Sequence, residues 1–109
     1  MTTTSRRVKI EAMLADDPTD DFLRYSLAME RDREGDHEGS LAGFRELIEQ
    51  ETPYVPAFFM AGQQFARLGR SEEAREVIRR GIEAAREQGD AHAAGEMSEF
   101  LQGLGGTGE

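Results

Sequence analysis

The sequence repeats itself with a period of 34 residues. An offset of 34 aligns residues of the same kind, namely Gly35 with Gly69, Phe44 with Ile78, Ile48 with Ile82, Ile10 with Phe44 and Leu14 with Ile48. A fixed period of this size is typical of arrays in which each repeat is one supersecondary unit that buries its apolar face against its neighbours. The period therefore excludes most other folds before any single residue is considered.

The segments between the few turn signals favour helix. They are rich in Ala, Leu, Glu and Arg, which are strong helix formers, and the chain has only three prolines. Few stretches alternate apolar and polar residues as strands do. We expect six helices, over about 5–16, 20–33, 37–51, 54–68, 71–88 and 90–103.

Glycines and capping residues mark the ends of these helices. Gly35, Gly69 and Gly89 each follow a helical stretch, where a left-handed residue is expected. The residues that follow them, Asp36, Ser71 and Asp90, are the predicted N-caps. Because the loops are only a few residues long, consecutive helices must be antiparallel and in contact.

The length of 109 residues suits one domain, which we place over 1–109. Within it, residues 5–19 form a leading half repeat and residues 20–53 the first full repeat. Residues 54–88 form the second repeat and residues 89–103 a closing, capping helix. Residues 104–109, which are rich in glycine, are predicted to be a flexible tail.

The repeat resembles the tetratricopeptide repeat (TPR) family. In the first helix of a repeat, the family has aromatic and small residues at the spacing seen in Phe58-x-x-Ala61-Gly62-x-x-Phe65. In the second helix it has a small residue followed four positions later by a large apolar one, as Ala74 and Ile78 are here. Ser40 with Phe44 supplies the same pair one repeat earlier. The resemblance implies an all-α, right-handed α-solenoid fragment of antiparallel helical hairpins.

The first full repeat departs from the family pattern. Arg24 and Arg31 stand where the family prefers aromatic residues. We therefore expect its first helix to have a weaker packing face than the first helix of the second repeat.

Composition excludes several classes of partner. The chain is acidic, with 22 Asp and Glu against 13 Lys and Arg and a net charge of −9, so phosphate-rich nucleic acids and anionic membranes would be repelled. It has no cysteine, which excludes disulfides and thiolate metal sites. Its longest apolar run, Ala57 to Gly62, is too short to span a membrane, and its N-terminus lacks the pattern of a signal peptide. We expect a cytoplasmic protein.

Three fragments resemble chemical motifs but lack features that each motif needs. Residues 16–20 match a DDxxD motif, but aspartates at this place are better explained as caps of the next helix. His37-Glu38 begins an HExxH zinc motif whose second ligand would be Leu41, which cannot coordinate a metal. The glycine-rich tail has no helix after it to bind a phosphate. We expect no enzyme activity, no catalytic residue, no metal and no cofactor.

The resemblance also places the candidate binding residues. In the family the first helix of each hairpin lines a concave groove, which gives the positions Tyr25, Met29, Asp32, Phe59, Gln63 and Arg67 here. Phe58 takes the core position, which directs Phe59 toward the groove. An alternative is that the closing helix covers this surface through Met97, Phe100 and Leu101. Tyr25 and Phe59 remain candidates for either groove or core.

The predicted function is a non-catalytic protein–protein interaction scaffold that presents a short concave groove to a peptide or helix. The alternative is a homo-oligomeric structural protein, such as a homodimer, that uses the same apolar surface for self-association. The cluster of Lys and Asn with which family members bind terminal carboxylates is missing. The identity of the partner does not follow from the sequence.

Overall fold

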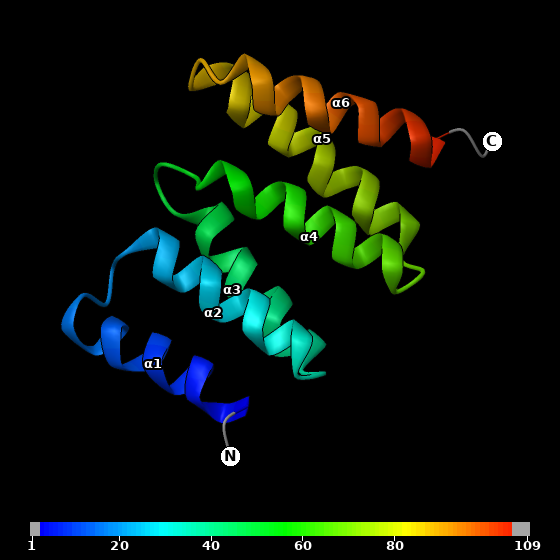
Figure 1. Ribbon diagram of the computed structural model, residues 1–109. Helices are drawn as coiled ribbons and strands as arrows, with labels where there is room; N and C mark the ends of the chain where they lie inside the picture. The colour runs from blue at the N-terminus through cyan, green and yellow to red at the C-terminus, as the bar shows by residue number, and fades with distance from the viewer. Residues whose placement is uncertain (1–2, 106–109) are drawn as a thin grey trace. The chain divides into compact units, whose positions relative to one another are not determined.

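The computed structural model describes residues 3–105, and side chains from residue 6 to residue 104. Within this range the chain is all-helical, with six helices and no strand: α1 Thr3–Asp16, α2 Asp21–Arg33, α3 His37–Glu49, α4 Val55–Arg67, α5 Ser71–Glu87 and α6 Ala91–Gly105 (Figure 1). Every predicted helix is present, with ends within two residues of those expected. Helix α6 extends into the segment predicted as a tail, and residues 106–109 lie outside the described range.

The predicted glycine helix ends are confirmed. Gly35, Gly69 and Gly89 have φ values of 91°, 78° and 76°, a left-handed conformation that other residues rarely adopt. Each of them lets the chain reverse direction within a few residues. These reversals produce the antiparallel hairpins that the spacing predicted.

Aspartates cap three of the helices. Asp20 accepts a hydrogen bond from the Leu23 amide at 2.9 Å, Asp36 from the Gly39 amide at 3.0 Å and Asp90 from the Ala93 amide at 3.1 Å. The capping interpretation of residues 16–20 is therefore confirmed through Asp20. These bonds satisfy amides that have no partner inside the helix.

The predicted N-cap at Ser71 is wrong. Ser71 is the first helical residue of α5, and Arg70 takes the capping position without a side-chain cap bond. The Arg70 guanidinium instead binds the Glu73 carboxylate, with Nε 2.8 Å from Oε1. The acidic first turn of α5 thus compensates for the missing cap, because carboxylates are favourable near a helix N-terminus.

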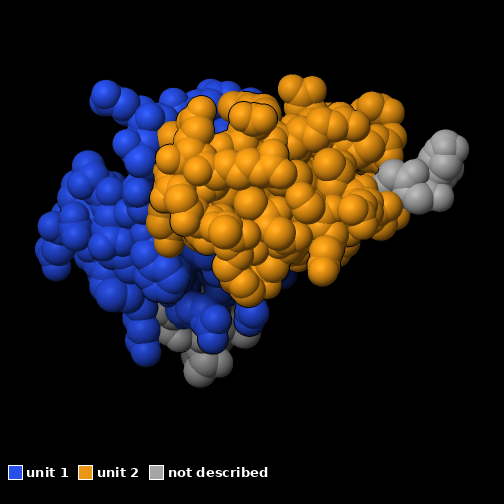
Figure 2. Space-filling model, turned by 90° about the horizontal axis from the view of Figure 1, so that it is seen from above, with its two compact units in different colours: residues 1–52 blue, residues 53–109 orange. Residues whose placement is uncertain are grey.

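The chain divides into two compact units, residues 1–52 with α1–α3 and residues 53–109 with α4–α6, which Figure 2 colours separately. Each unit has its own buried core. In the second unit, Phe58, Ile78 and Met97 come from three different helices and are almost completely buried. The closing helix α6 therefore contributes Met97 to the core of its unit.

Glycines allow the three helices of the second unit to approach closely. A methyl group on Gly62 of α4 would clash with Ile78 of α5. A methyl group on Gly81 would lie 2.5 Å from Cβ of Phe58 and 2.6 Å from Sδ of Met97. Gly62 therefore lies where α4 crosses α5, and Gly81 lies at a second crossing, where α5 meets α4 and α6 together.

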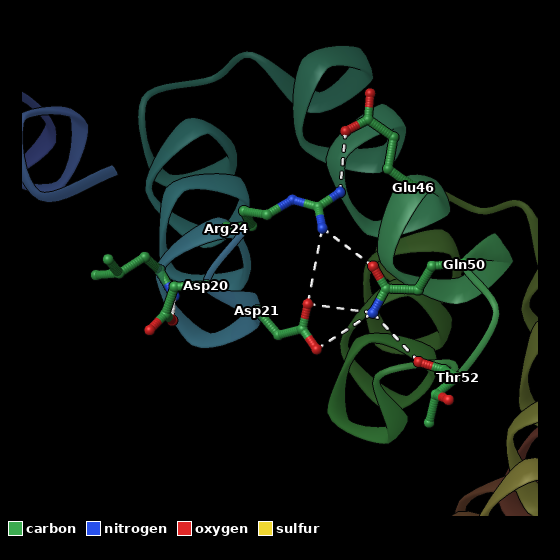
Figure 3. A network of polar contacts seen from close by, with 7 residues as sticks. Asp20, Asp21, Arg24, Glu46, Gln50 and Thr52 are labelled. Carbon is green, nitrogen blue, oxygen red and sulfur yellow. Dashed lines mark hydrogen bonds and ion pairs between the residues drawn. The ribbon is translucent and has the colours of Figure 1, made fainter. Parts of the chain in front are cut away.

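In the first unit a polar network joins α2 to the end of α3 (Figure 3). Arg24 donates to Gln50 Oε1 at 3.0 Å and forms ion pairs with Asp21 at 3.7 Å and Glu46 at 3.4 Å. Gln50 in turn donates to both oxygens of Asp21 at 3.1 and 3.2 Å. Arg24 therefore replaces the missing aromatic contact with directed hydrogen bonds. This face of α2 is therefore polar, and its Arg24 side chain is bound to Asp21, Glu46 and Gln50.

Ion pairs of Arg6 and Arg7 join the first half of α1 to the C-terminal end of α2. Arg7 Nε donates to Glu34 at 2.9 Å, and Arg7 Nη1 donates to Glu11 at 3.2 Å. The nearby Glu34 charge, followed by the bond to Glu11, raises the pKa of the Arg7 guanidinium. Among the described side chains of α1, only Ile10 is buried, so the rest of this helix packs incompletely.

Candidate binding faces

The six predicted binding residues come from two helices, one in each unit. Tyr25, Met29 and Asp32 lie on α2, and Phe59, Gln63 and Arg67 lie on α4. Spacings of three and four residues align each set along one side of its helix. We describe the two faces one at a time.

Tyr25 is half-buried and packs against aromatic neighbours of its own unit. Its ring centroid lies 5.9 Å from that of Phe44, which is buried, and 6.4 Å from that of Phe22, which is exposed. Tilted ring pairs at these distances are favourable. Tyr25 thus forms the outer edge of the first core and still presents part of its ring to solvent.

Met29 and Asp32 have neighbours on other helices of the first unit. Met29 lines a groove with residues of α1. Asp32 lies with Oδ1 2.7 Å from Nδ1 of His37, the first residue of α3. This contact bridges the turn between α2 and α3, so Asp32 has a structural role in its hairpin.

The contacts of Phe59 match neither of its two predicted positions, groove or core, completely. Its ring meets that of Phe100 of α6 edge-on, with centroids 5.6 Å apart and planes at 66°. Phe59 nevertheless remains half-buried, whereas its neighbour Phe58 is only 2% exposed. The closing helix therefore covers one edge of Phe59 without enclosing the ring.

Gln63 and Arg67 continue the line of Phe59 along α4. Gln63 is half-buried and Arg67 is exposed. Just beyond them the Arg70 guanidinium lies 4.9 Å from the centre of the Phe65 ring, a cation–π contact. Helix α4 contains no Asp or Glu, although every other described helix contains at least two. This face therefore combines an aromatic ring, an amide and a guanidinium group, and α4 itself supplies no carboxylate.

One candidate surface was missed by the sequence analysis. A groove of about 330 Å³ opens between α1 and α2, lined in part by Ile10, Met13 and Phe22. The 34-residue offset contains the signal that could have found it, because it aligns Ile10 and Met13 with the buried Phe44 and Leu47. Apolar residues at those positions indicate a face made for packing.

Within residues 3–105, no group of three or more His, Asp or Glu side chains is placed to hold a metal ion. In the same range, no helix combines the length and the apolar character that crossing a membrane requires.

Comparison with known proteins finds a close structural likeness. No family model matches the sequence, and no curated protein matches it significantly. A solution NMR structure of a tetratricopeptide repeat domain protein from Salinibacter ruber superposes with a TM-score of 0.77 and 34% identity, covering 82% of this chain and 90% of that one. A crystal structure of a tetratricopeptide repeat domain protein from the same organism gives a TM-score of 0.71 and 33% identity, covering 80% and 97%. Six helices with a 34-residue repeat, together with this level of identity, establish that the chain belongs to the tetratricopeptide repeat family.

Proposed function

We propose that this protein is a non-catalytic scaffold that presents a short concave groove to a peptide or a helix of a partner protein, and that the α4 face and the α2 face are each a contact surface for such a segment. The likeness to TPR domain proteins indicates a protein-interaction module in general, and this repeat fold is typically a non-catalytic scaffold. The finer assignment of the contact surface rests on the side chains described above.

The observation that carries the proposal is the composition of the α4 face. Phe59 offers a partly exposed aromatic ring, Gln63 an amide that can both donate to and accept from a peptide backbone, and Arg67 a positive charge. An aromatic ring beside adaptable polar groups is common at protein interfaces. The partly exposed ring of Phe59 favours a partner segment with an apolar anchor, and α4 supplies no carboxylate that would repel an acidic residue of that segment.

The α2 face contributes in the same way. Tyr25 and Met29 are half-buried, so both keep solvent-accessible surface next to their internal contacts. A thioether and a phenol ring suit binding to varied apolar side chains. Self-association through Tyr25 and Phe59 is the alternative use of the same residues.

Selection from a displayed peptide library, followed by calorimetry with the selected peptides, tests the proposal. We expect peptides with an apolar anchor to bind the native chain, and the double variant Phe59→Ala/Gln63→Ala to bind at least about tenfold more weakly, equivalent to about 1.4 kcal/mol. Light scattering on Phe59→Ala/Tyr25→Ala examines the self-association alternative.

The matched control is Arg79→Ala/Arg80→Ala on the exposed surface of α5. This control should bind the peptides as the native chain does. The proposal fails if the library yields no binder, or if the selected peptides bind the α4 variant as tightly as the native chain.

A further inference from the structure

The groove between α1 and α2 has apolar walls and an open side. Helix α1 supplies Ile10 and Met13, and α2 supplies Phe22, Leu23 and Met29. Phe22 is 61% exposed and Met13 is 49% exposed, which are large values for side chains of this size. Apolar side chains exposed together beside a groove are a candidate interaction surface.

The repeat pattern identifies this groove as an unfilled helix position. Ile10 and Met13 of α1 align with Phe44 and Leu47 of α3, which are buried in the hairpin that α3 forms with α2. The same face of α5, which contains Ile78, is buried against α4. Among residues 3–105, no helix takes the corresponding place beside α1. The occupant that fits is therefore a helix antiparallel to α1.

The charges on α1 oppose its own dipole. Arg6 lies in its first turn, near the positive end of the helix, while Asp16 and the following Asp17 lie at its negative end. Charges of this sign at these ends are unfavourable. Helix α2 has the favourable arrangement, with Asp21 in its first turn and Arg31 and Arg33 in its last. An antiparallel neighbour of matching charge would neutralise both ends of α1.

The rim of the groove also has unbalanced positive charge. Arg6 and Arg33 lie 3.9 Å and 3.6 Å from the same carboxylate, that of Glu30, which is buried. The side chains of the two arginines are 64% and 65% exposed. One carboxylate thus faces two largely exposed guanidinium groups, so this end of the groove attracts an acidic helix end.

We propose that the occupant is α1 of a second copy of this chain, which lies antiparallel to the first α1 and forms a symmetric dimer. Antiparallel pairing brings Asp16 and Asp17 of the second copy to Arg6 and Arg33, and the two-fold axis repeats the same contacts at the other end. Met13 and Phe22 of each copy are then covered by the other. This surface differs from the α4 face and shares only Met29 with the α2 face, and the proposal does not depend on peptide binding.

Sedimentation equilibrium over a wide range of protein concentration, up to about 1 mM, tests the dimer. We expect the mass to rise from 12.1 kDa toward twice that value for the native chain. Met13→Glu should keep the mass at the monomer value, because it places a charge in the apolar contact. Leu68→Glu, at an exposed apolar residue at the end of α4, is the matched control and should dimerise like the native chain.

A charge exchange provides a second test that does not alter the apolar contact. Arg6→Glu alone and Asp16→Arg/Asp17→Arg alone should each dimerise at least about tenfold more weakly, since each places like charges together. An equimolar mixture of the two variants should recover the dimer, because both ends of the pair then join opposite charges. Circular dichroism verifies that every variant has the native helix content.

A native chain that stays monomeric up to the highest concentration would overturn the proposal. It is equally overturned if Met13→Glu dimerises normally, or if the mixed charge variants associate no better than either variant alone.

Discussion

The two units follow one 34-residue pattern, yet they pack by different means. At equivalent positions the second unit has Phe58, which is buried, and the first has Arg24, which is held in a polar network. Burial and close contact of the Phe58 ring stabilise the fold through the hydrophobic effect. The hydrogen bonds of Arg24 stabilise it less, because they replace hydrogen bonds that the guanidinium would otherwise make with water. The repeat therefore determines where the helices lie, while individual side chains determine how strongly neighbouring helices bind one another.

A second set of equivalent positions shows a similar difference at α1. Gly81 in α5 allows Phe58 and Met97 to touch its backbone, and its equivalent one period earlier, Leu47 of α3, is completely buried. Two periods earlier, Met13 of α1 is 49% exposed in an open groove. Close approach with no void maximises dispersion contacts. We therefore expect the second unit to be the more stable one.

The largest expected effect is at Phe58. Phe58→Ala should lower the free energy of unfolding by about 3–5 kcal/mol, as truncation of buried aromatic residues does. Arg24→Ala at the equivalent position of the first unit should cost about 1–2 kcal/mol, because it removes polar contacts that are partly exposed to water. Urea denaturation of both variants measures the difference, and equal losses would show that the units pack alike.

A smaller effect is expected at Gly81. Gly81→Ala should destabilise the chain by about 1–3 kcal/mol, because a methyl group there overlaps Phe58 and Met97 and this outweighs the gain in helix propensity. Gly95→Ala in α6 is the control, since a methyl group there meets open space and should stabilise by up to about 1 kcal/mol. Thermal melts that rank the two variants in the opposite order would contradict the close packing at Gly81.

Much of the fold could be predicted from local signals. The 34-residue offset and the glycines at 35, 69 and 89 gave the number and limits of the helices, because they depend on backbone conformation and spacing. Ser71 was misassigned since Arg70, a poor capping residue by propensity, can compensate through Glu73. The Arg24 network was not predictable, because it joins α2 to residues that lie 22 to 29 positions later in the sequence, and the rotamers of these side chains depend on the assembled hairpin.

The candidate site was harder to predict than the fold. Sequence spacing places Tyr25, Met29 and Asp32 on one side of a helix, but it cannot tell that Asp32 meets His37 or that Met29 faces α1. The sequence did not decide whether Phe59 lies in the groove or in the core. In the structure one edge of its ring meets Phe100 while the residue stays half-buried, so it shares features of both positions. The α1–α2 groove was not predicted, because the exposure of Met13 and Phe22 depends on which helices pack beside α1, and spacing along the sequence does not specify this.

Amide hydrogen exchange tests most directly whether the two units are held unequally. It should be measured at a protein concentration low enough that the chain is monomeric, so that no partner protects α1. We predict that the slowest amides lie in α4 and α5, and that those of α1 exchange at least about tenfold faster, a difference of about 1.4 kcal/mol in opening free energy. Equal protection of α1 and of α4–α5 would contradict the account.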